Sequence, residues 1–209
     1  VASETRRLAR LVQQMLDLSR MENSTAPLNL EPVDMVPFVR SIVNAQERLF
    51  VDRDLRLRFA DETQGHDDVV EADPDMITQC VINLLSNAMR YTPEGGSIKI
   101  KLRSGERLII SVQDNGCGIP EKDLPHIFER FYKVDKSRGE GGTGLGLSIV
   151  QRIVTMLGGT IRLKSEKGKG SHIKVEIPMQ TAEELPEQIN QIRIHHNHTF
   201  HDVIAIDND

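Results

Sequence analysis

Residues 73–93 of this 209-residue chain read DPDMITQCVINLLSNAMRYTP and are its most informative segment. Asp73 followed by Pro74 is typical of a helix start, because the carboxylate can cap free amides and proline suits the first helical position. The apolar residues that follow recur at spacings of three and four, which predicts a helix with one buried face. On that helix Asn83 and Asn87 lie four residues apart and share a side. Amides in a mostly apolar helix are costly unless they form hydrogen bonds, so they are satisfied locally or bind a ligand.

The segments on either side of this helix predict a mixed sheet. Alternating apolar and polar residues indicate strands, and helical spacing of apolar residues indicates two further helices. The predicted strands are 55–59, 69–72, 97–103, 107–113, 160–166 and 171–177, and the predicted helices are 34–49, 73–90 and 145–157. Three helices that cover one face of a mixed sheet make a two-layer α/β sandwich, which is the fold class we expect.

One amphipathic helix precedes the sandwich. Apolar residues in 1–22 recur at spacings of three and four while arginine, glutamine and aspartate fill the other face. The run Asn-Ser-Thr-Ala-Pro that follows is a linker by composition. We therefore expect four parts: the helix 1–22, a linker 23–33, the sandwich 34–180 and a poorly ordered tail 181–209.

Composition and charge exclude several classes of protein. Hydrophobic residues make up 38% and charged residues 27% of the chain, so a packed core is expected. Cys80 and Cys117 are too few for a disulfide scaffold and indicate a reducing compartment. The net charge of −5 (26 basic and 31 acidic residues) and the 4% of aromatic residues argue against nucleic-acid binding. No apolar run reaches the roughly 18 residues of a membrane span. We therefore expect a cytoplasmic chain with no nucleic-acid partner and no membrane contact of its own.

Two glycine-rich stretches stand out, and the second of them is a candidate phosphate site. Residues 114–120 (DNGCGIP) follow a predicted strand, and residues 139–147 (GEGGTGLGL) precede a predicted helix. Glycines let a backbone approach a ligand, and a helix N-terminus presents free N–H groups to phosphate. The residues before Gly139 do not form a strand, so a dinucleotide-binding fold is excluded. Gly144 is followed by Leu145 rather than lysine, which excludes a P-loop. A flexible surface loop is the alternative interpretation.

Five motifs, in this order and at this spacing, resemble those of sensor histidine kinases. They are the N-box 83–93, the first glycine box 114–120, the F-box 128–132, the second glycine box 142–147 and the third glycine box 168–171. The resemblance covers about residues 34–178. It implies the Bergerat ATP-binding sandwich, which gyrase, heat-shock chaperone and mismatch-repair ATPases share, and it implies ATP and Mg²⁺ as cofactors.

The resemblance also implies a role for individual residues. Asp114 would accept a hydrogen bond from the adenine amino group, and Asn87 would hold Mg²⁺ through its amide oxygen. Residues 133–144 would form a lid over the nucleotide. The expected catalytic residues are Asn83, Arg90 and Lys133. The expected ATP-binding residues are Asn83, Asn87, Arg90, Tyr91, Asp114, Gly116, Gly118, Ile119, Lys133, Gly142, Thr143, Gly144, Leu145, Gly146 and Ser171.

The first N-box position separates phosphoryl transfer from hydrolysis. The ATPase relatives carry a glutamate there as general base, whereas this chain has Asn83. An amide cannot take a proton from water at neutral pH, so we expect slow hydrolysis and transfer of the γ-phosphoryl group to another acceptor. The resemblance implies a protein histidine kinase, whose acceptor is a histidine on a dimerisation domain and whose product is relayed to a response-regulator aspartate. Arg90 stands where the family more often has lysine, and its fork-shaped guanidinium changes the contact.

The sequence contains no motif that resembles the phospho-acceptor segment His-Glu-Leu-Arg-Thr-Pro. Residues 16–22 resemble the end of the second dimerisation helix, which implies a kinase truncated within that domain. The implied partners are its own dimerisation helices, in a homodimer, and a response-regulator receiver domain; the parent protein would be membrane-anchored. Two alternatives stay open: a Bergerat-fold serine kinase of anti-sigma type, in which residues 1–22 would have no counterpart, and a nucleotide-binding module without catalysis.

Overall fold

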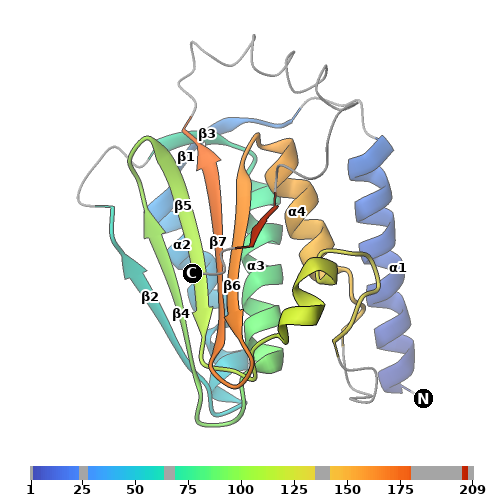
Figure 1. The fold of residues 1–209 in the computed structure, drawn as a ribbon. Coiled ribbons are helices and arrows are strands. Elements are labelled where there is room, and N and C mark those ends of the chain that lie inside the picture. Colours follow the sequence, from blue (N-terminus) through green and yellow to red (C-terminus); the bar gives the residue numbers. More distant parts are fainter. Residues whose placement is uncertain (1, 24–27, 64–68, 135–141, 180–203, 207–209) are drawn as a thin grey trace.

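A computed structural model describes residues 2–23, 28–63, 69–134, 142–179 and 204–206 of the chain (Figure 1). The helices are α1 (Ala2–Asn23), α2 (Met35–Val51), α3 (Pro74–Tyr91) and α4 (Gly146–Met156), with a 3₁₀ helix η1 (Glu121–His126). The strands are β1 (Glu31–Asp34), β2 (Arg56–Asp61), β3 (Val69–Ala72), β4 (Ser97–Arg103), β5 (Arg107–Asp114), β6 (Thr160–Glu166), β7 (Gly170–Pro178) and β8 (Ile204–Ile206).

The main sheet has six strands in the order β2-β4-β5-β7-β6-β8. The outer pairs β2–β4 and β6–β8 are parallel, and the pairs between them are antiparallel. Helices α2, α3 and α4 cover one face of this sheet (Figure 1), so the structure has the predicted two-layer α/β sandwich. A separate antiparallel pair, β1 with β3, lies beside it.

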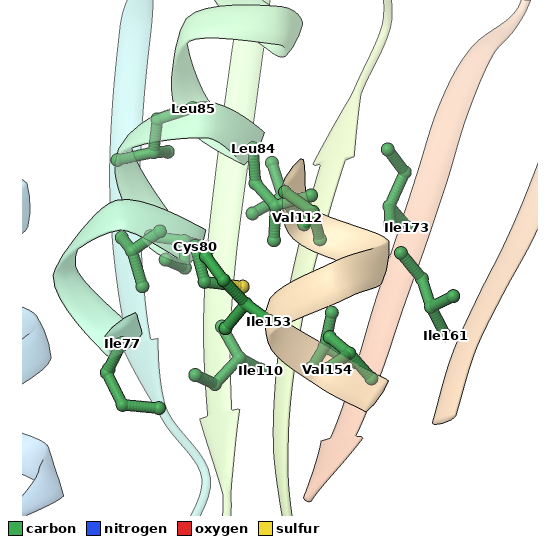
Figure 2. Packing of buried hydrophobic residues seen from close by; sticks show 14 of the residues in the cluster. Ile77, Cys80, Leu84, Leu85, Ile110, Val112, Ile153, Val154, Ile161 and Ile173 are labelled. Carbon is green, nitrogen blue, oxygen red and sulfur yellow. The ribbon is translucent and has the colours of Figure 1, made fainter. Parts of the chain in front are cut away.

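The core lies between the helices and the inward-facing side of the sheet. Strand alternation places Ile98, Ile100 and Leu102 of β4 inward, and each is at most 1% exposed. The apolar face of α3, with Cys80 and Leu84, packs over Ile110 and Val112 of β5, together with α4 (Figure 2). Burial raises the pKa of the Cys80 thiol to about 12, so this cysteine is a protonated core group at neutral pH.

Helix α3 begins as its sequence predicts. The Asp73 Oδ1 atom accepts a hydrogen bond from the Met76 amide at 3.2 Å, and Pro74 occupies the first helical position. The second Asp73 oxygen accepts from the Asn29 amide at 3.1 Å, which ties the segment before β1 to the helix start. Asp34 occupies the same position before α2 but forms no side-chain capping bond.

The C-terminal end of helix α1 packs against α4 (Figure 1). Leu18 is buried, and the Arg152 Nη2 atom of α4 donates to the Met21 carbonyl at 2.8 Å. Toward the N-terminus, Leu8 and Val12 are 60% and 53% exposed. The predicted apolar stripe of this helix is therefore covered at one end only.

Two strands lie where none was predicted. β1 falls in the segment expected to be mostly linker, and β8 falls in the expected tail. β1 pairs with β3 in the separate two-stranded sheet, and β8 pairs with the edge strand β6. Each short strand depends on its partner, which local sequence does not encode. The predicted domain boundaries stay predictions, since the rest of the tail and residues 135–141 of the predicted lid lie outside the described residues. No helix in the described part of the chain is long and apolar enough to cross a membrane.

Candidate functional site

The motif residues meet where the C-terminal half of α3 faces the loop after β5 and the segment before α4. A Cβ atom added to Gly116 would clash with the Tyr91 carbonyl, and one added to Gly142 would clash with the Arg90 guanidinium. Both glycines therefore allow backbone to lie directly against α3. We call residues 114–120 the Asp114 loop and residues 142–147 the Gly142 segment.

The Asp114 carboxylate is held by two backbone amides. Its Oδ1 atom accepts from the Gly116 amide at 2.9 Å and from the Ser171 amide at 3.2 Å. Burial raises the pKa of Asp114, and these two hydrogen bonds offset part of that rise. Both described bonds go to Oδ1, so Oδ2 is the oxygen that can accept a hydrogen bond from a ligand.

The Asp114 loop is fixed by backbone hydrogen bonds from two other parts of the chain. The Cys117 amide donates to the Tyr91 carbonyl at 3.0 Å, and the Cys117 carbonyl accepts from the Gly168 amide at 2.7 Å. Gly118 has a φ of +63°, and a Cβ atom there would clash with the Glu166 carbonyl. Only glycine fits this position without strain, because both the left-handed backbone and the close approach exclude a side chain.

Ser165 is a site residue that lies outside all five motifs. Its hydroxyl accepts from the Ile119 amide at 2.9 Å and lies 2.9 Å from the Gly170 carbonyl and 2.8 Å from the Ser171 hydroxyl. It thus connects the Asp114 loop to the β6–β7 hairpin, whose Ser171 amide holds Asp114. The signal that could have found it is alternation: Ser165 occupies an inward position of β6, where a polar residue needs partners.

The two asparagines of α3 differ in their bonding. The Asn83 Nδ2 atom donates to the Gln79 carbonyl of its own helix at 2.9 Å, and Asn83 Oδ1 lies 3.4 Å from the position of a Cβ at Gly146. The Asn87 amide is half-buried and forms no hydrogen bond to any residue in the described ranges. Asn87 is therefore the amide that can bind a ligand with both of its polar atoms.

The ends of the predicted lid meet at one point. The Phe131 amide donates to the Gly144 carbonyl at 2.9 Å, and both residues have positive φ values, of 63° and 77°. A Cβ atom at Gly144 would lie 2.7 Å from the Phe131 carbonyl carbon. Both ends of the lid segment thus lie directly before the N-terminus of α4, where helix amides are free to bind an anion.

Three predicted binding residues make contacts within the chain itself. The Thr143 hydroxyl donates to Gln14 Oε1 of α1 at 2.6 Å, and it accepts from the Leu145 amide at 3.3 Å. Leu145 is fully buried, and its side chain belongs to the hydrophobic core. The Tyr91 carbonyl, rather than its phenol, is the group that contacts the Asp114 loop.

Lys133 follows the Phe131 anchor and is half-buried. No residue in the described part of the chain forms an ion pair with it. The remaining predicted residues fall into two groups. Asp114, Gly116, Gly118, Ile119 and Ser171 lie together at one end of the site, and Asn83, Arg90, Gly142 and Gly146 lie together at the other.

The side chains of the site that could bind a metal ion suit one kind of metal. Within the described ranges, no group of three or more His, Cys, Asp or Glu side chains could hold a metal ion. A closed protein cage for zinc or calcium is therefore not built from these residues. Magnesium commonly takes few protein oxygens and several phosphate and water oxygens, and the Asn87 amide oxygen is suited to that arrangement.

Comparison with known proteins identifies the family. The profile of the histidine kinase-, DNA gyrase B- and HSP90-like ATPases matches residues 72–181, which is more than half of the chain. The chain belongs to this family. The predicted resemblance to the ATP-binding catalytic domain of sensor histidine kinases is thereby confirmed.

Relatives in this family match most of the chain. The sensor histidine kinase WalK of Bacillus subtilis is 38% identical over 187 residues, which cover 87% of this chain and 30% of WalK. The histidine kinase AdeS of Acinetobacter baumannii is similar in structure, with a TM-score of 0.69, 28% identity and coverage of 86% of this chain and 82% of that one. Full-length ShkA in complex with AMPPNP has a TM-score of 0.73 and 28% identity, covering 84% of this chain and 36% of ShkA. The chain spans 30% of the length of the WalK proteins of Bacillus subtilis and Staphylococcus saprophyticus.

Proposed function

We propose that this chain binds ATP with Mg²⁺ and donates the γ-phosphoryl group to a histidine of a dimerisation domain, for relay to a response-regulator aspartate. The observation that carries the proposal is the Asp114 carboxylate. Two backbone amides orient it through one oxygen, and the other oxygen is left to accept a hydrogen bond. A carboxylate oxygen presented in this way can accept a hydrogen bond from an amino group, and the adenine of ATP carries one.

The Asp114 end would bind the base. Gly116 and Gly118 bring the loop backbone close enough for the base to lie against it, and Ile119 adds an apolar contact. The Ser171 hydroxyl, which lies beside Ser165, would join the contact to adenine through water.

The other end would bind the phosphates. Gly142, Gly144 and Gly146 bring backbone amides to the N-terminus of α4, whose partial positive charge favours an anion. Arg90 lies against Gly142, and its fork of donors suits phosphate oxygens. Lys133 and Thr143 would complete the contacts from the lid side, and Tyr91 at the end of α3 would contact the ribose side.

Asn87 would hold the metal through its amide oxygen. When bound, Mg²⁺ supplies positive charge that neutralises the phosphate oxygens. The chain itself would position the nucleotide and keep hydrolysis slow. Asn83 cannot act as a general base, and its Nδ2 atom already donates to its own helix. The γ-phosphoryl group is therefore retained for a protein acceptor.

Helix α1 supplies the link to partners. Its exposed apolar residues, Leu8 and Val12 among them, need a partner surface in the assembled protein. We propose that this helix belongs to a dimerisation domain, that the parent protein is a homodimer, and that the receiver domain of a response regulator is its second partner. The described sandwich would then be the cytoplasmic part of a membrane-anchored parent.

Calorimetric titration with ATP, with and without Mg²⁺, tests nucleotide binding. We expect Asp114→Ala to abolish measurable binding in both conditions. Asn87→Ala should weaken binding strongly with Mg²⁺ and little without it. Asn44→Ala, which changes an exposed asparagine on α2, is the matched control and should bind as the wild type does. Equal losses for Asn87→Ala in both conditions would contradict its role as metal ligand.

Phosphoryl transfer requires a separate assay, because the proposed acceptor lies on helices that this chain does not contain. Radiolabelled ATP is added to the chain together with a dimerisation domain that carries the acceptor histidine. We expect acid-labile label on that domain and slow release of free phosphate. Fast release of phosphate with no labelled protein would indicate an ATPase instead.

A further inference from the structure

The face of the main sheet that points away from the helices is rich in basic side chains. In Figure 1, α1, α2, α3 and α4 all lie on the other side of the sheet. Strand alternation assigns every second residue of β2, β4, β5, β6 and β7 to this open face. The basic residues among them are Arg56, Arg58, Lys99, Lys101, Arg103, Arg107, Arg162, Lys164 and Lys174.

The strand register arranges most of these residues in two adjacent rows, which we call the basic rows. The first row runs across five strands through Arg58, Lys99, Gln113, His172 and Lys164. The second row runs through Ala60, Lys101, Ser111, Lys174 and Arg162. Six formal positive charges and one histidine thus share two rows that contain no carboxylate. Neighbouring strands are about 4.8 Å apart, so these charges are close together.

Among the described residues, Glu62 and Glu176 pair with cations of the rows. Glu62 lies 2.9 Å from Lys101, and Glu176 lies 2.7 Å from Lys174 and 3.8 Å from Arg162. Six row cations against these two carboxylates leave an excess of positive charge. Burial, and then the charges of Lys101, Lys174 and Lys164, lower the pKa of His172. Charge of one sign over a broad face produces a long-range attraction for anions.

The composition of the basic rows indicates what kind of anion they fit. Protein interfaces are enriched in aromatic residues and depleted in lysine, whereas these rows contain lysine and no aromatic residue. Single-stranded nucleic acid is bound by stacking on aromatic side chains, which the rows also lack. An anionic lipid surface needs neither a pocket nor an aromatic anchor, because each lysine or arginine near it adds electrostatic attraction independently. We propose that the basic rows dock this domain on an anionic lipid surface.

The net charge of the chain favours the expectation that it does not bind anionic surfaces, and this proposal departs from that expectation. A net charge of −5 argues against anion binding only if charge is spread evenly, and the strand register segregates it. The proposed nucleotide site uses α3, α4 and the helix-facing side of the strand ends, where Asp114 and Ser165 lie, whereas the basic rows occupy the opposite face of the sheet. Lipid docking therefore neither requires nor blocks nucleotide binding, and it stands independently of the proposed function.

Vesicle sedimentation at about 0.15 M salt tests the proposal. The wild-type chain should sediment with vesicles that contain phosphatidylglycerol and stay in solution with pure phosphatidylcholine. Removal of one cation should lower the partition about fivefold, so Lys99→Gln combined with Lys164→Gln should lower it roughly 25-fold. The matched control, Lys122→Gln with Arg48→Gln, removes two exposed charges from outside the sheet and should leave the partition within about twofold.

The outcomes distinguish lipid docking by the basic rows from attraction by net charge and from nucleic-acid binding. ATP titration of the Lys99→Gln, Lys164→Gln variant should match the wild type, which confirms that the variant is folded. Equal losses in this variant and the control would overturn the proposal, since net charge alone would then govern binding. Binding to duplex DNA without binding to phosphatidylglycerol vesicles would overturn it as well.

Discussion

The two ends of the candidate site differ in the atoms that surround their glycines. In the Asp114 loop, a Cβ atom added to Gly116 or Gly118 would strike a carbonyl group of the main chain. In the Gly142 segment, one added to Gly142 would strike the end of the Arg90 side chain, and one added to Gly146 would only approach Asn83. Gly144, pressed against the Phe131 backbone, is the exception.

This difference matches what each end is proposed to bind. A rigid loop binds a planar base with one amino group best, because preorganised contacts lose little entropy on binding. A triphosphate and its metal ion demand adjustment, and flexible side chains such as Arg90 can provide it. Four substitutions test this contrast, from the largest expected effect to the smallest.

Substitution of Gly118 should have the largest effect on stability. Gly118→Ala places a Cβ atom against the Glu166 carbonyl and forces alanine into the left-handed region, so we expect about 3 kcal/mol of destabilisation in urea unfolding. Gly168→Ala separates the two causes, because Gly168 has a φ of +84° with no atom within 4 Å of the added Cβ. It should cost about 1 kcal/mol. Gly105→Ala, with nothing within 4 Å, should stay within about 0.5 kcal/mol of wild type. If all three variants were equally stable, the Asp114 loop would not be rigid.

Asp114→Asn should weaken ATP binding and stabilise the free protein at the same time. Loss of a charged acceptor should reduce affinity about 10- to 100-fold by calorimetry. Burial raises the folded-state pKa of Asp114 above its unfolded value, so between the two values the folded state binds more protons and stability falls as pH rises. Above both pKa values the carboxylate is ionised and carries the full cost of burial, which neutral asparagine removes. The melting temperature at pH 7 should therefore rise, and a fall would show that the carboxylate is a structural anchor.

Ser165→Ala tests whether the Ser165 hydroxyl positions Asp114. Loss of the Ile119 and Gly170 partners should cost about 1–2 kcal/mol of stability. The specific readout is base discrimination: ATP affinity should fall several-fold, while inosine triphosphate, which has no 6-amino group, should bind as it does to wild type. Ser111→Ala, another buried serine of the same sheet, is the control and should preserve the ratio of the two affinities. A parallel loss for both nucleotides would indicate a structural role alone.

Gly142→Ala should have the smallest effect on stability. The added Cβ displaces only the Arg90 guanidinium, so unfolding free energy should change by less than about 0.5 kcal/mol. ATP affinity should fall about threefold to tenfold, because Arg90 is moved from the phosphates. Adenosine, which lacks phosphates, should bind the variant and the wild type equally. A stability loss as large as that of Gly118→Ala would remove the contrast between the two ends.

Local sequence was sufficient for most of the helices and strands and for the motif positions, although not for β1 and β8. The start of α3 at Asp73 and Pro74, both hairpins and the glycine stretches follow from capping, alternation and turn chemistry, which act over a few residues. Asn83 in place of a glutamate is likewise evident from the sequence alone, and with it the expectation of transfer rather than hydrolysis.

Contacts between distant segments were decided by the tertiary structure. Ser165 meets Ile119 across 46 positions, and Gln14 meets Thr143 across 129, so no local pattern could pair them. The basic rows have the same origin. Each strand shows only alternating charges, and the lateral register of five strands places Lys99, His172 and Lys164 in one line. Sequence periodicity fixes which face a side chain takes, whereas register, which depends on packing of the whole sheet, fixes its neighbours.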